Sequence, residues 1–490
     1  MVFSSNIFLF FFLPAFLILY FLTPQKFRNY TLLLFSLVFY AYGAPDFVLI
    51  LVGECLVNYF LVKAMAKRRT ENEKRRTVLC ALSIILTLGM LLYFKYANFF
   101  MENVNAVLGW FQHTPVSWRK IALPIGISFF TFQSITYTLD VYRGTTPPSN
   151  KLTDYVLYIM MFPQLIAGPI VNYNTVAAQL VSRESTMEGR VLGFYRFVIG
   201  LSKKVLIANT LAVYADQVFG MNYANLSTSA AWLGILSYTM QIYFDFSGYS
   251  DMAIGLGMMM GFRFPENFNN PYTSKSITEF WKRWHITLGN FIMHYLYIPL
   301  GGNRKGKGRM YLNLWLCFLL SGLWHGASWN FVLWGAFHGL FICLDKLLSG
   351  TAKPSTKRSE LKRKTENGKR KTIHFPLSTF ITFFLVMMGW VLFRADDIAG
   401  AGGFYATLFS FKQGFHGTTD AQFWTTLVVA LVFSFLTLTK WGQRLQDTVF
   451  AEHYSKRCSW VMFAITLVLL VLSTGSLCVS DFNPFIYFRF

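Results

Sequence analysis

Apolar blocks about as long as a bilayer is thick recur along the whole chain, and they constrain the fold more than any other feature. Only 14% of the 490 residues are charged and 54% are hydrophobic, whereas a soluble domain carries roughly 25% charged residues. A stretch of about 20 apolar residues crosses the hydrocarbon core of a bilayer as one helix. The sequence therefore predicts an all-α, polytopic integral membrane protein.

The apolar blocks predict roughly 11–13 membrane helices. They cover residues 7–22, 30–42, 47–65, 77–94, 121–141, 155–171, 191–219, 230–246, 310–323, 329–347, 375–393, 423–438 and 460–477. The first block has no basic segment before it and no small-residue cleavage site after it. We therefore interpret it as a retained helix and not as a signal peptide.

The basic residues lie mainly in the predicted loops. In a soluble protein the net charge of +21 would suggest nucleic acid as a partner. Here, clusters within residues 63–76 and 353–371 are typical of loops on the cytoplasmic side, where they also meet anionic lipid. The loop at residues 43–46 has no Lys or Arg, so we place it outside, together with the N-terminus. Membrane lipid is thus the expected partner, and nucleic acid is not.

We expect one membrane domain in four parts. These are N-terminal helices (1–110), a catalytic core (120–345), a basic cytoplasmic loop (349–371) and C-terminal helices (375–490). Three segments of the core fit neither clean helices nor hydrophilic loops, namely residues 162–169, 248–261 and 280–300. Broken backbone at membrane depth is tolerated where it is buried in protein or lines a watery cavity. The core is therefore predicted to contain re-entrant segments around a central tunnel.

One histidine stands inside a long apolar stretch of this core. His325 lies within residues 312–340, which otherwise consist mainly of Leu, Phe, Val, Ala and Gly, with Trp324 and Trp329 beside it. An ionisable side chain at membrane depth is costly and is a functional candidate by default. A neutral imidazole is also well suited to accept a proton near neutral pH. His325 is either a catalytic base or a satisfied core residue.

Two further histidines lie well inside the central apolar region. If the helix after His325 were continuous, His338 would lie thirteen residues and roughly 20 Å away, too far to share a proton. The Gly-Ala-Ser step at 326–328 weakens this estimate because it can break a helix. His285 is on a different segment and is free to fold back toward His325. We take His325 and His285 as the candidate catalytic residues.

Several other kinds of site are not supported by the sequence. The histidines and the six cysteines lack the spacings of a metal site, so no metal is expected. There is no G-x-S-x-G elbow, and the glycine-rich residues 301–304 lack the spacing of a phosphate loop. A base-assisted transfer remains, in which an imidazole deprotonates a hydroxyl that attacks an acyl thioester.

Two carboxylates also lie among apolar residues. Asp245 and Asp251 are costly at membrane depth and need partners. We expect them to bond to backbone in a broken helix, or to pair with Lys282 or Arg283, in preference to a direct role in catalysis.

A series of segments in fixed order gives the most specific signal. The segments are residues 123–133, 140–144, 162–169, 245–251, 280–288, 297–304, 323–329, 390–395 and 484–488. Together they resemble the membrane-bound O-acyltransferase family, in particular the branch that contains the alginate O-acetyltransferase membrane subunit. The resemblance implies that His325 matches the near-invariant histidine of the family and that His285 matches its second motif position. It also implies a helical fold whose tunnel or funnels meet near that histidine.

The resemblance further implies a function in the bacterial cytoplasmic membrane. An acetyl group from a cytoplasmic donor, acetyl-CoA or another acyl thioester, passes toward an extracytoplasmic acceptor; the donor is a substrate, and no tightly bound cofactor is expected. A separate secreted or membrane-anchored transferase then acetylates a polysaccharide. Two alternatives stay open. One is D-alanyl transfer to teichoic acid, by a nearby branch of shorter proteins, and the other is a polymer transporter or scaffold without covalent chemistry.

Overall fold

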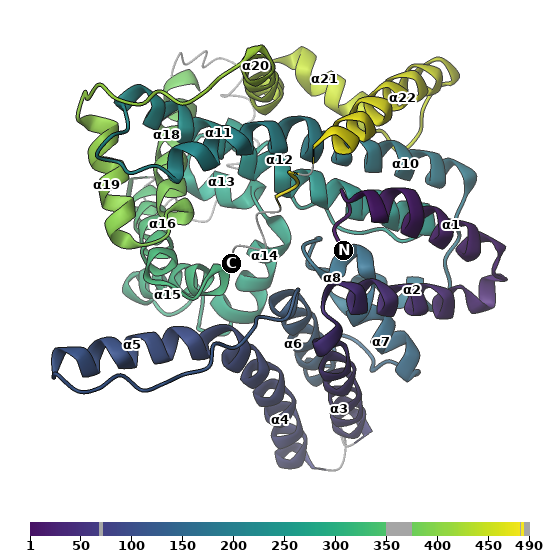
Figure 1. The fold of residues 1–490 in the computed structure, drawn as a ribbon. Helices are drawn as coiled ribbons and strands as arrows, with labels where there is room; N and C mark the ends of the chain where they lie inside the picture. The colour runs from purple at the N-terminus through teal and green to yellow at the C-terminus, as the bar shows by residue number, and fades with distance from the viewer. Residues whose placement is uncertain (68–71, 349–374, 481, 485–490) are drawn as a thin grey trace, which may run out of the picture. The chain divides into compact units, whose positions relative to one another are not determined.

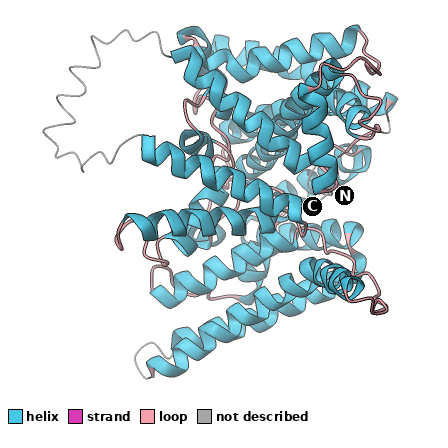
Figure 2. Cartoon of the chain, turned by 90° about the vertical axis from the view of Figure 1, so that its left-hand side faces the viewer, coloured by secondary structure: helices cyan, strands magenta, loops and turns pink. Residues whose placement is uncertain are grey.

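The protein is helical throughout the part of the chain that the structure describes. The computed structural model describes residues 1–67, 72–348, 375–480 and 482–484. Within these ranges the chain forms helices and loops and no strand (Figures 1 and 2). The predicted all-α fold class is confirmed. The predicted basic loop at 349–371 lies outside the described residues.

Six of the described helical segments are long and apolar enough to cross a membrane, judged by length and composition. They are Pro45–Lys67, Glu73–Trp110, Trp329–Leu348, Leu377–Arg394, Ala421–Leu438 and Lys456–Val479. The predicted polytopic membrane protein is therefore confirmed. The sequence count of spans is higher because some predicted spans are interrupted. The block at 155–171, for example, contains two short helices, α7 (Leu152–Met160) and α8 (Phe162–Leu165). The predicted tunnel and the predicted sidedness of the loops stay predictions.

The described chain packs into two compact units, each built from separate stretches. Unit 1 consists of Met1–Thr210, Gln241–Glu266 and Thr448–Phe490, and unit 2 of Leu211–Met240 and Asn267–Asp447. Three helices continue from one unit into the other. They are α11 (Asn209–Phe219), α12 (Thr228–Met260) and α21 (Lys440–Val449).

Unit 1 holds the N-terminal helices and the last helix. They are α1 (Leu13–Leu22), α2 (Arg28–Gly43), α3 (Val48–Lys67), α4 (Glu73–Leu91), α5 (Ala97–Trp110), α6 (Ile127–Arg143), α7, α8, α9 (Tyr173–Val181), α10 (Met187–Ser202) and α22 (Lys456–Val479). Short 3-10 or π segments extend some of them, at Phe8–Phe12, Gln25–Phe27, Pro45–Phe47, Leu92–Tyr96 and Lys203–Ala208.

Unit 2 holds the helices that carry the candidate histidines. Its helices are α13 (Ile277–Arg283), α14 (Ile286–Ile292), α15 (Lys307–His325), α16 (Trp329–Leu348), α18 (Phe375–Arg394), α19 (Ile398–Phe409) and α20 (Ala421–Phe435). Its short 3-10 or π segments are Pro271–Thr273, Met293–Tyr297 and Leu436–Leu438. Successive helices α13 and α14 are separated only by Trp284 and His285, so the predicted break within residues 280–300 is confirmed.

The predicted break within residues 248–261 is wrong, because α12 runs unbroken to Met260. The glycines there serve the packing of α12 against α10. A Cβ on Gly248 would lie 2.7 Å from the carbonyl oxygen of Gly200, and a Cβ on Gly255 would lie 2.5 Å from that of Gly193. Small residues at such positions let two membrane helices approach backbone to backbone. The helix therefore needs glycine for close contact and not for a bend.

Candidate active site

His325 is the last residue of α15. The following Gly326 is extended, with φ −161° and ψ 146°, and α16 begins three residues later at Trp329. The step at 326–328 thus breaks the helix, and the chain reverses to form a helical hairpin. His325 is buried in this hairpin, with 6% of its surface exposed.

Glycines allow the two helices of the hairpin to pack closely. A Cβ on Gly322 would collide with the carbonyl oxygen of Phe331, and a Cβ on Gly335 would collide with that of Phe318. These pairs run in opposite directions along the two helices, so α15 and α16 are antiparallel. Side chains from both helices therefore surround the imidazole at the end of α15.

Aromatic rings enclose the His325 imidazole. The ring centroids of Trp324, Trp334 and Phe393 lie 4.8, 5.0 and 5.3 Å from that of His325, each in an edge-to-face arrangement. Phe393 comes from α18, which packs against α16. Edge-to-face contacts of this kind fix the orientation of an aromatic ring. The three rings leave the His325 imidazole in a largely apolar enclosure.

His285 lies between α13 and α14 and is 1% exposed. Its backbone is left-handed, with φ +45° and ψ 54°, a conformation that is uncommon outside glycine. Its Nδ1 lies 3.0 Å from Oδ1 of Asn267. Strained backbone at a buried polar residue is a frequent feature of functional sites. Here it occurs at the residue whose imidazole contacts the Asn267 amide.

The two predicted histidines meet at one indole. The Trp324 ring lies 4.8 Å from the His325 ring and 6.1 Å from the His285 ring, measured between centroids. Two residues that are forty positions apart in the sequence therefore flank the same side chain. The structure thus brings together the pair that the sequence singled out, through α13, α14 and α15.

His338 is completely buried in the same unit, and the Trp334 indole lies between its ring and that of His325 in the sense that it contacts both. The Trp334 ring is 5.0 Å from the His325 ring and 5.0 Å from the His338 ring. The estimate of roughly 20 Å from a continuous helix is wrong for this chain, because the helix ends at His325 and α16 folds back. Trp281 also packs on His338, at 5.0 Å. The Trp334 indole therefore contacts both imidazoles, and an indole does not relay protons between them.

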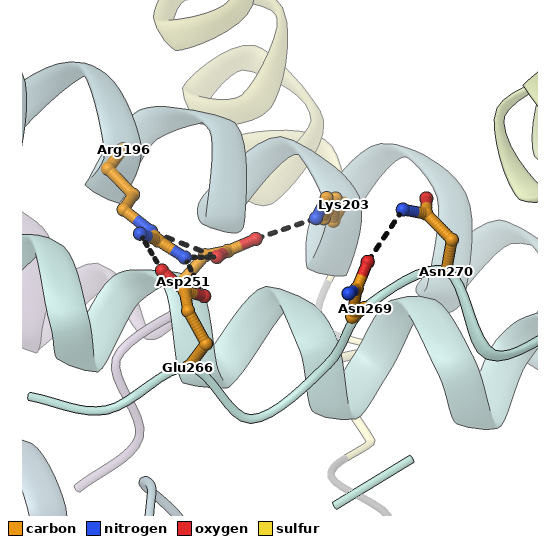
Figure 3. A network of polar contacts seen from close by, with 6 residues as sticks. All are labelled: Arg196, Lys203, Asp251, Glu266, Asn269 and Asn270. Carbon is orange, nitrogen blue, oxygen red and sulfur yellow. Dashed lines mark hydrogen bonds and ion pairs between the residues drawn. The ribbon is translucent and has the colours of Figure 1, made fainter. Parts of the chain in front are cut away.

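The expected partners of the two carboxylates are wrong. Asp251 accepts from Arg196 at 2.8 Å and from Lys203 at 2.6 Å, and Glu266 also binds Arg196 (Figure 3). Asp245 pairs with Lys204 at 2.7 Å. All of these residues belong to unit 1. The partners come from α10 and the segment directly after it, and not from the predicted Lys282 and Arg283.

The other four described histidines lie elsewhere, and one of them, the exposed His113, follows α5. His294 contacts the backbone of its own helix, His416 contacts two serines, and the exposed His453 contacts Glu188. Among the residues that the structure describes, no three His, Cys, Asp or Glu side chains gather in a group that would hold a metal ion.

Sequence reasoning missed several neighbours of the histidines. Asn267 was not singled out because it lies 18 residues before His285 in an irregular segment, where no periodicity marks it. Trp334 and Phe393 were not singled out as neighbours of His325. Trp334 lies in the predicted span 329–347, and Phe393 lies in the segment 390–395 that carries the family resemblance, but neither position indicated a contact with His325.

Comparison with known proteins extends this picture. Residues 149–390 match the sequence profile of the membrane-bound O-acyltransferase family. The chain is 42% identical to the "probable alginate O-acetylase" of Pseudomonas putida, over the whole of both chains. It is 36% identical to the peptidoglycan O-acetyltransferase of Helicobacter pylori, over 82% of this chain and 78% of that protein. Similarity to the teichoic acid D-alanyltransferase of Bacillus subtilis is 28%, over 44% of this chain and 58% of that protein.

Proposed function

The chain belongs to the membrane-bound O-acyltransferase family, and from this premise we propose that it passes an acetyl group across the membrane for O-acetylation of a polysaccharide. The donor is a cytoplasmic acyl thioester, with acetyl-CoA as the first candidate. The acceptor is extracytoplasmic, and a separate secreted or membrane-anchored transferase completes the modification. The protein works in the cytoplasmic membrane of a bacterium.

One observation carries the catalytic part of the proposal. Two buried imidazoles, His285 and His325, contact the same indole within a helical membrane protein. Burial of ionisable side chains is expensive and is typical of functional sites in membranes. We expect the aromatic rings around them to keep water from the thioester and so to limit its hydrolysis.

His325 is the general base. Its neutral imidazole takes the proton from the acceptor hydroxyl while the hydroxyl oxygen attacks the thioester carbonyl carbon. A C–O bond forms, and the carbonyl oxygen becomes an oxyanion. The oxyanion then collapses, the C–S bond breaks, and the proton passes from the imidazolium to the departing thiolate. Atoms and charges balance without a metal ion or a redox partner.

His285 is the second polar group of the site. It lies on the other segment that contacts Trp324, and it donates or accepts a hydrogen bond at the reacting acyl group. The family profile match includes both histidines, since residues 149–390 span positions 285 and 325.

The relatives favour acetyl transfer over D-alanyl transfer. Identity is 42% over the full length for the protein named as an alginate O-acetylase, but 28% over 44% of this chain for the teichoic acid D-alanyltransferase. Peptidoglycan is named for a relative that is 36% identical, so the proposed acceptor is a polysaccharide as a class and not one particular polymer. Supplying membranes with acetyl-CoA or with a D-alanyl carrier protein distinguishes the two donors.

Replacement of His325 in living cells tests the proposed function. Cells that express His325→Ala are expected to secrete polymer without O-acetyl groups, while the variant accumulates in the membrane to the wild-type level. A transporter or scaffold predicts the opposite, namely movement of polymer with normal acetylation. Wild-type acetylation by a fully accumulated His325→Ala protein contradicts the proposal.

A further inference from the structure

The side chain of Asn267 contacts the buried His285 imidazole and the residue two positions after it. Asn267 is itself 1% exposed. Its Oδ1 lies 3.0 Å from His285 Nδ1, 2.9 Å from the Thr287 hydroxyl and 3.4 Å from the Thr287 backbone nitrogen. One amide oxygen therefore holds three groups on both sides of Ile286.

The backbone contact identifies the amide atom as oxygen. A backbone N–H is only a donor, so the Asn267 atom that faces the nitrogen of Thr287 must be an acceptor. The amide nitrogen is a donor and cannot occupy this position. The Thr287 donor therefore determines which end of the Asn267 amide points toward it, although the oxygen and nitrogen ends are similar in shape.

The amide oxygen in turn fixes the tautomer of His285. Since Oδ1 of Asn267 only accepts, Nδ1 of His285 must carry the hydrogen of this bond. In a neutral imidazole with Nδ1 protonated, the lone pair is on Nε2. His285 therefore presents Nε2 as its basic nitrogen and keeps Nδ1 turned toward Asn267.

Backbone hydrogen bonds clamp the same two segments together. The Ile286 nitrogen donates to the Asn267 carbonyl at 3.0 Å, and the Asn269 nitrogen donates to the Arg283 carbonyl at 2.9 Å. His285 lies between these two bonds in its left-handed conformation. Asn269 also accepts from the Asn270 side chain at 3.2 Å, as Figure 3 shows. The segment that carries Asn267 is thus held at a fixed distance from the imidazole.

We propose that Asn267 is a positioning residue for acyl transfer, because its amide oxygen holds the His285 imidazole as the Nδ1–H tautomer with Nε2 toward the substrate. This inference rests on the proposed function, since it assumes that His285 takes part in the reaction. The amide has a second consequence. A neutral oxygen orients the imidazole without a charge that would favour its protonated form, as a carboxylate would.

A double-mutant cycle separates positioning from packing. The initial rate of CoA release from acetyl-CoA is measured in membranes that contain the full chain and its polysaccharide-modifying partner, per amount of folded protein. Asn267→Ala is expected to lower the rate about tenfold or more, the size of losing one buried hydrogen bond. In the His285→Ala background, Asn267→Ala is expected to change nothing further. Losses that multiply in the double variant overturn the proposal.

Two more variants sharpen the cycle. Thr287→Val removes one donor from the Asn267 oxygen but leaves the bond to His285, so its rate loss is expected to be smaller than that of Asn267→Ala. Asn267→Asp keeps the acceptor and adds a charge. It is expected to retain more activity than Asn267→Ala at high pH, and to lose it at a higher pH than the wild type when the pH falls. An Asn267→Asp profile that is parallel to the wild-type profile contradicts positioning through the imidazole.

The outcomes distinguish this inference from the proposed function. A wild-type rate for His285→Ala removes His285 from the reaction, so the proposed role of that histidine fails. A lost rate for His285→Ala beside a wild-type rate for Asn267→Ala leaves the role of His285 standing and overturns only the positioning by Asn267.

Discussion

In unit 1, the Asp251 carboxylate lies between the cationic side chains of Arg196 and Lys203 (Figure 3). In unit 2, the imidazoles of His285 and His325 lie among indole rings and one amide. Both regions bury polar groups, but the first pairs opposite charges, whereas the second packs its polar groups against aromatic rings and an amide. Removal of a partner leaves a buried charge in the first region, so the loss appears in stability. In the second region it changes a group that we propose to take part in the reaction, so the loss is expected in the rate.

The largest expected change in stability comes from breaking the charge network. Asp251→Ala leaves Arg196 and Lys203 without their shared carboxylate, whose side chain is only 9% exposed. The free energy of unfolding in detergent should fall by about 3–5 kcal/mol, the usual result of removing one partner of a buried ion pair. Activity per folded molecule should change far less than stability.

Glu266 offers a matched control in the same network. Its carboxylate binds the same arginine at 2.6 Å but is 56% exposed. Solvent screening limits such a pair, so Glu266→Ala should cost less than about 1 kcal/mol. Equal losses for Asp251→Ala and Glu266→Ala would mean that burial does not decide the strength of this network.

The second prediction concerns the hairpin of unit 2. A methyl group at Gly335 would collide with the Phe318 carbonyl oxygen and separate α16 from α15. Gly335→Ala should therefore cost about 1–3 kcal/mol by overpacking. It should also displace Trp334, which directly precedes Gly335 in the sequence, from its contact with the His325 ring. Thermal unfolding and the rate of CoA release are the two measurements.

The same helix pair contains a control glycine. Gly308 lies near the start of α15 and has no atom within 4 Å of an added Cβ. Gly308→Ala should leave the rate unchanged and should change stability by at most about 1 kcal/mol in the favourable direction. If Gly335→Ala behaved like Gly308→Ala, close packing of the hairpin would not be needed for the site.

The smallest expected effect is electrostatic and lies on the surface. The Glu188 carboxylate, 2.9 Å from Nδ1, raises the pKa of the exposed His453 imidazole. A pKa that is raised on folding stabilises the fold below the unfolded value of about 6.5 and loses this effect as the pH rises through the folded value. The stability difference between wild type and His453→Gln should therefore be present at about pH 5.5 and vanish well above neutrality. Added salt should reduce it, and a difference that grows with pH would have the wrong sign.

The sequence predicted the helices around the site well, because long apolar blocks have few alternatives in a membrane. The blocks at 310–323 and 329–347 became α15 (Lys307–His325) and α16 (Trp329–Leu348), and the step between them ends the first helix. The two candidate histidines also came from the sequence, since imidazoles are rare in such blocks. Their contact with the same Trp324 ring depends on tertiary packing and could not be predicted from the sequence.

Contacts between residues far apart in the sequence could not be predicted from local sequence patterns. Asp251 pairs with Arg196, which is 55 residues earlier on another helix, whereas the prediction chose basic residues that lay nearer in the sequence. The glycines of α12 were taken as helix breakers, but they pack against α10, and that role depends on the neighbouring helix. No sequence pattern around Asn267 marked it, because the role proposed for it depends on its contact with Nδ1 of His285, which is 18 residues away in the sequence.

Thioester cleavage by purified protein in lipid vesicles tests the central claim most directly. Wild type, His325→Ala and His338→Ala are compared with acetyl-CoA as the donor, together with the polysaccharide-modifying partner. His338 is the matched control, because it is equally enclosed and contacts the same Trp334 ring. The rate per folded molecule should fall about 10²–10⁴-fold for His325→Ala, the contribution expected of a general base, and stay near the wild-type value for His338→Ala. A folded His325→Ala protein that cleaves acetyl-CoA at the wild-type rate would contradict the account.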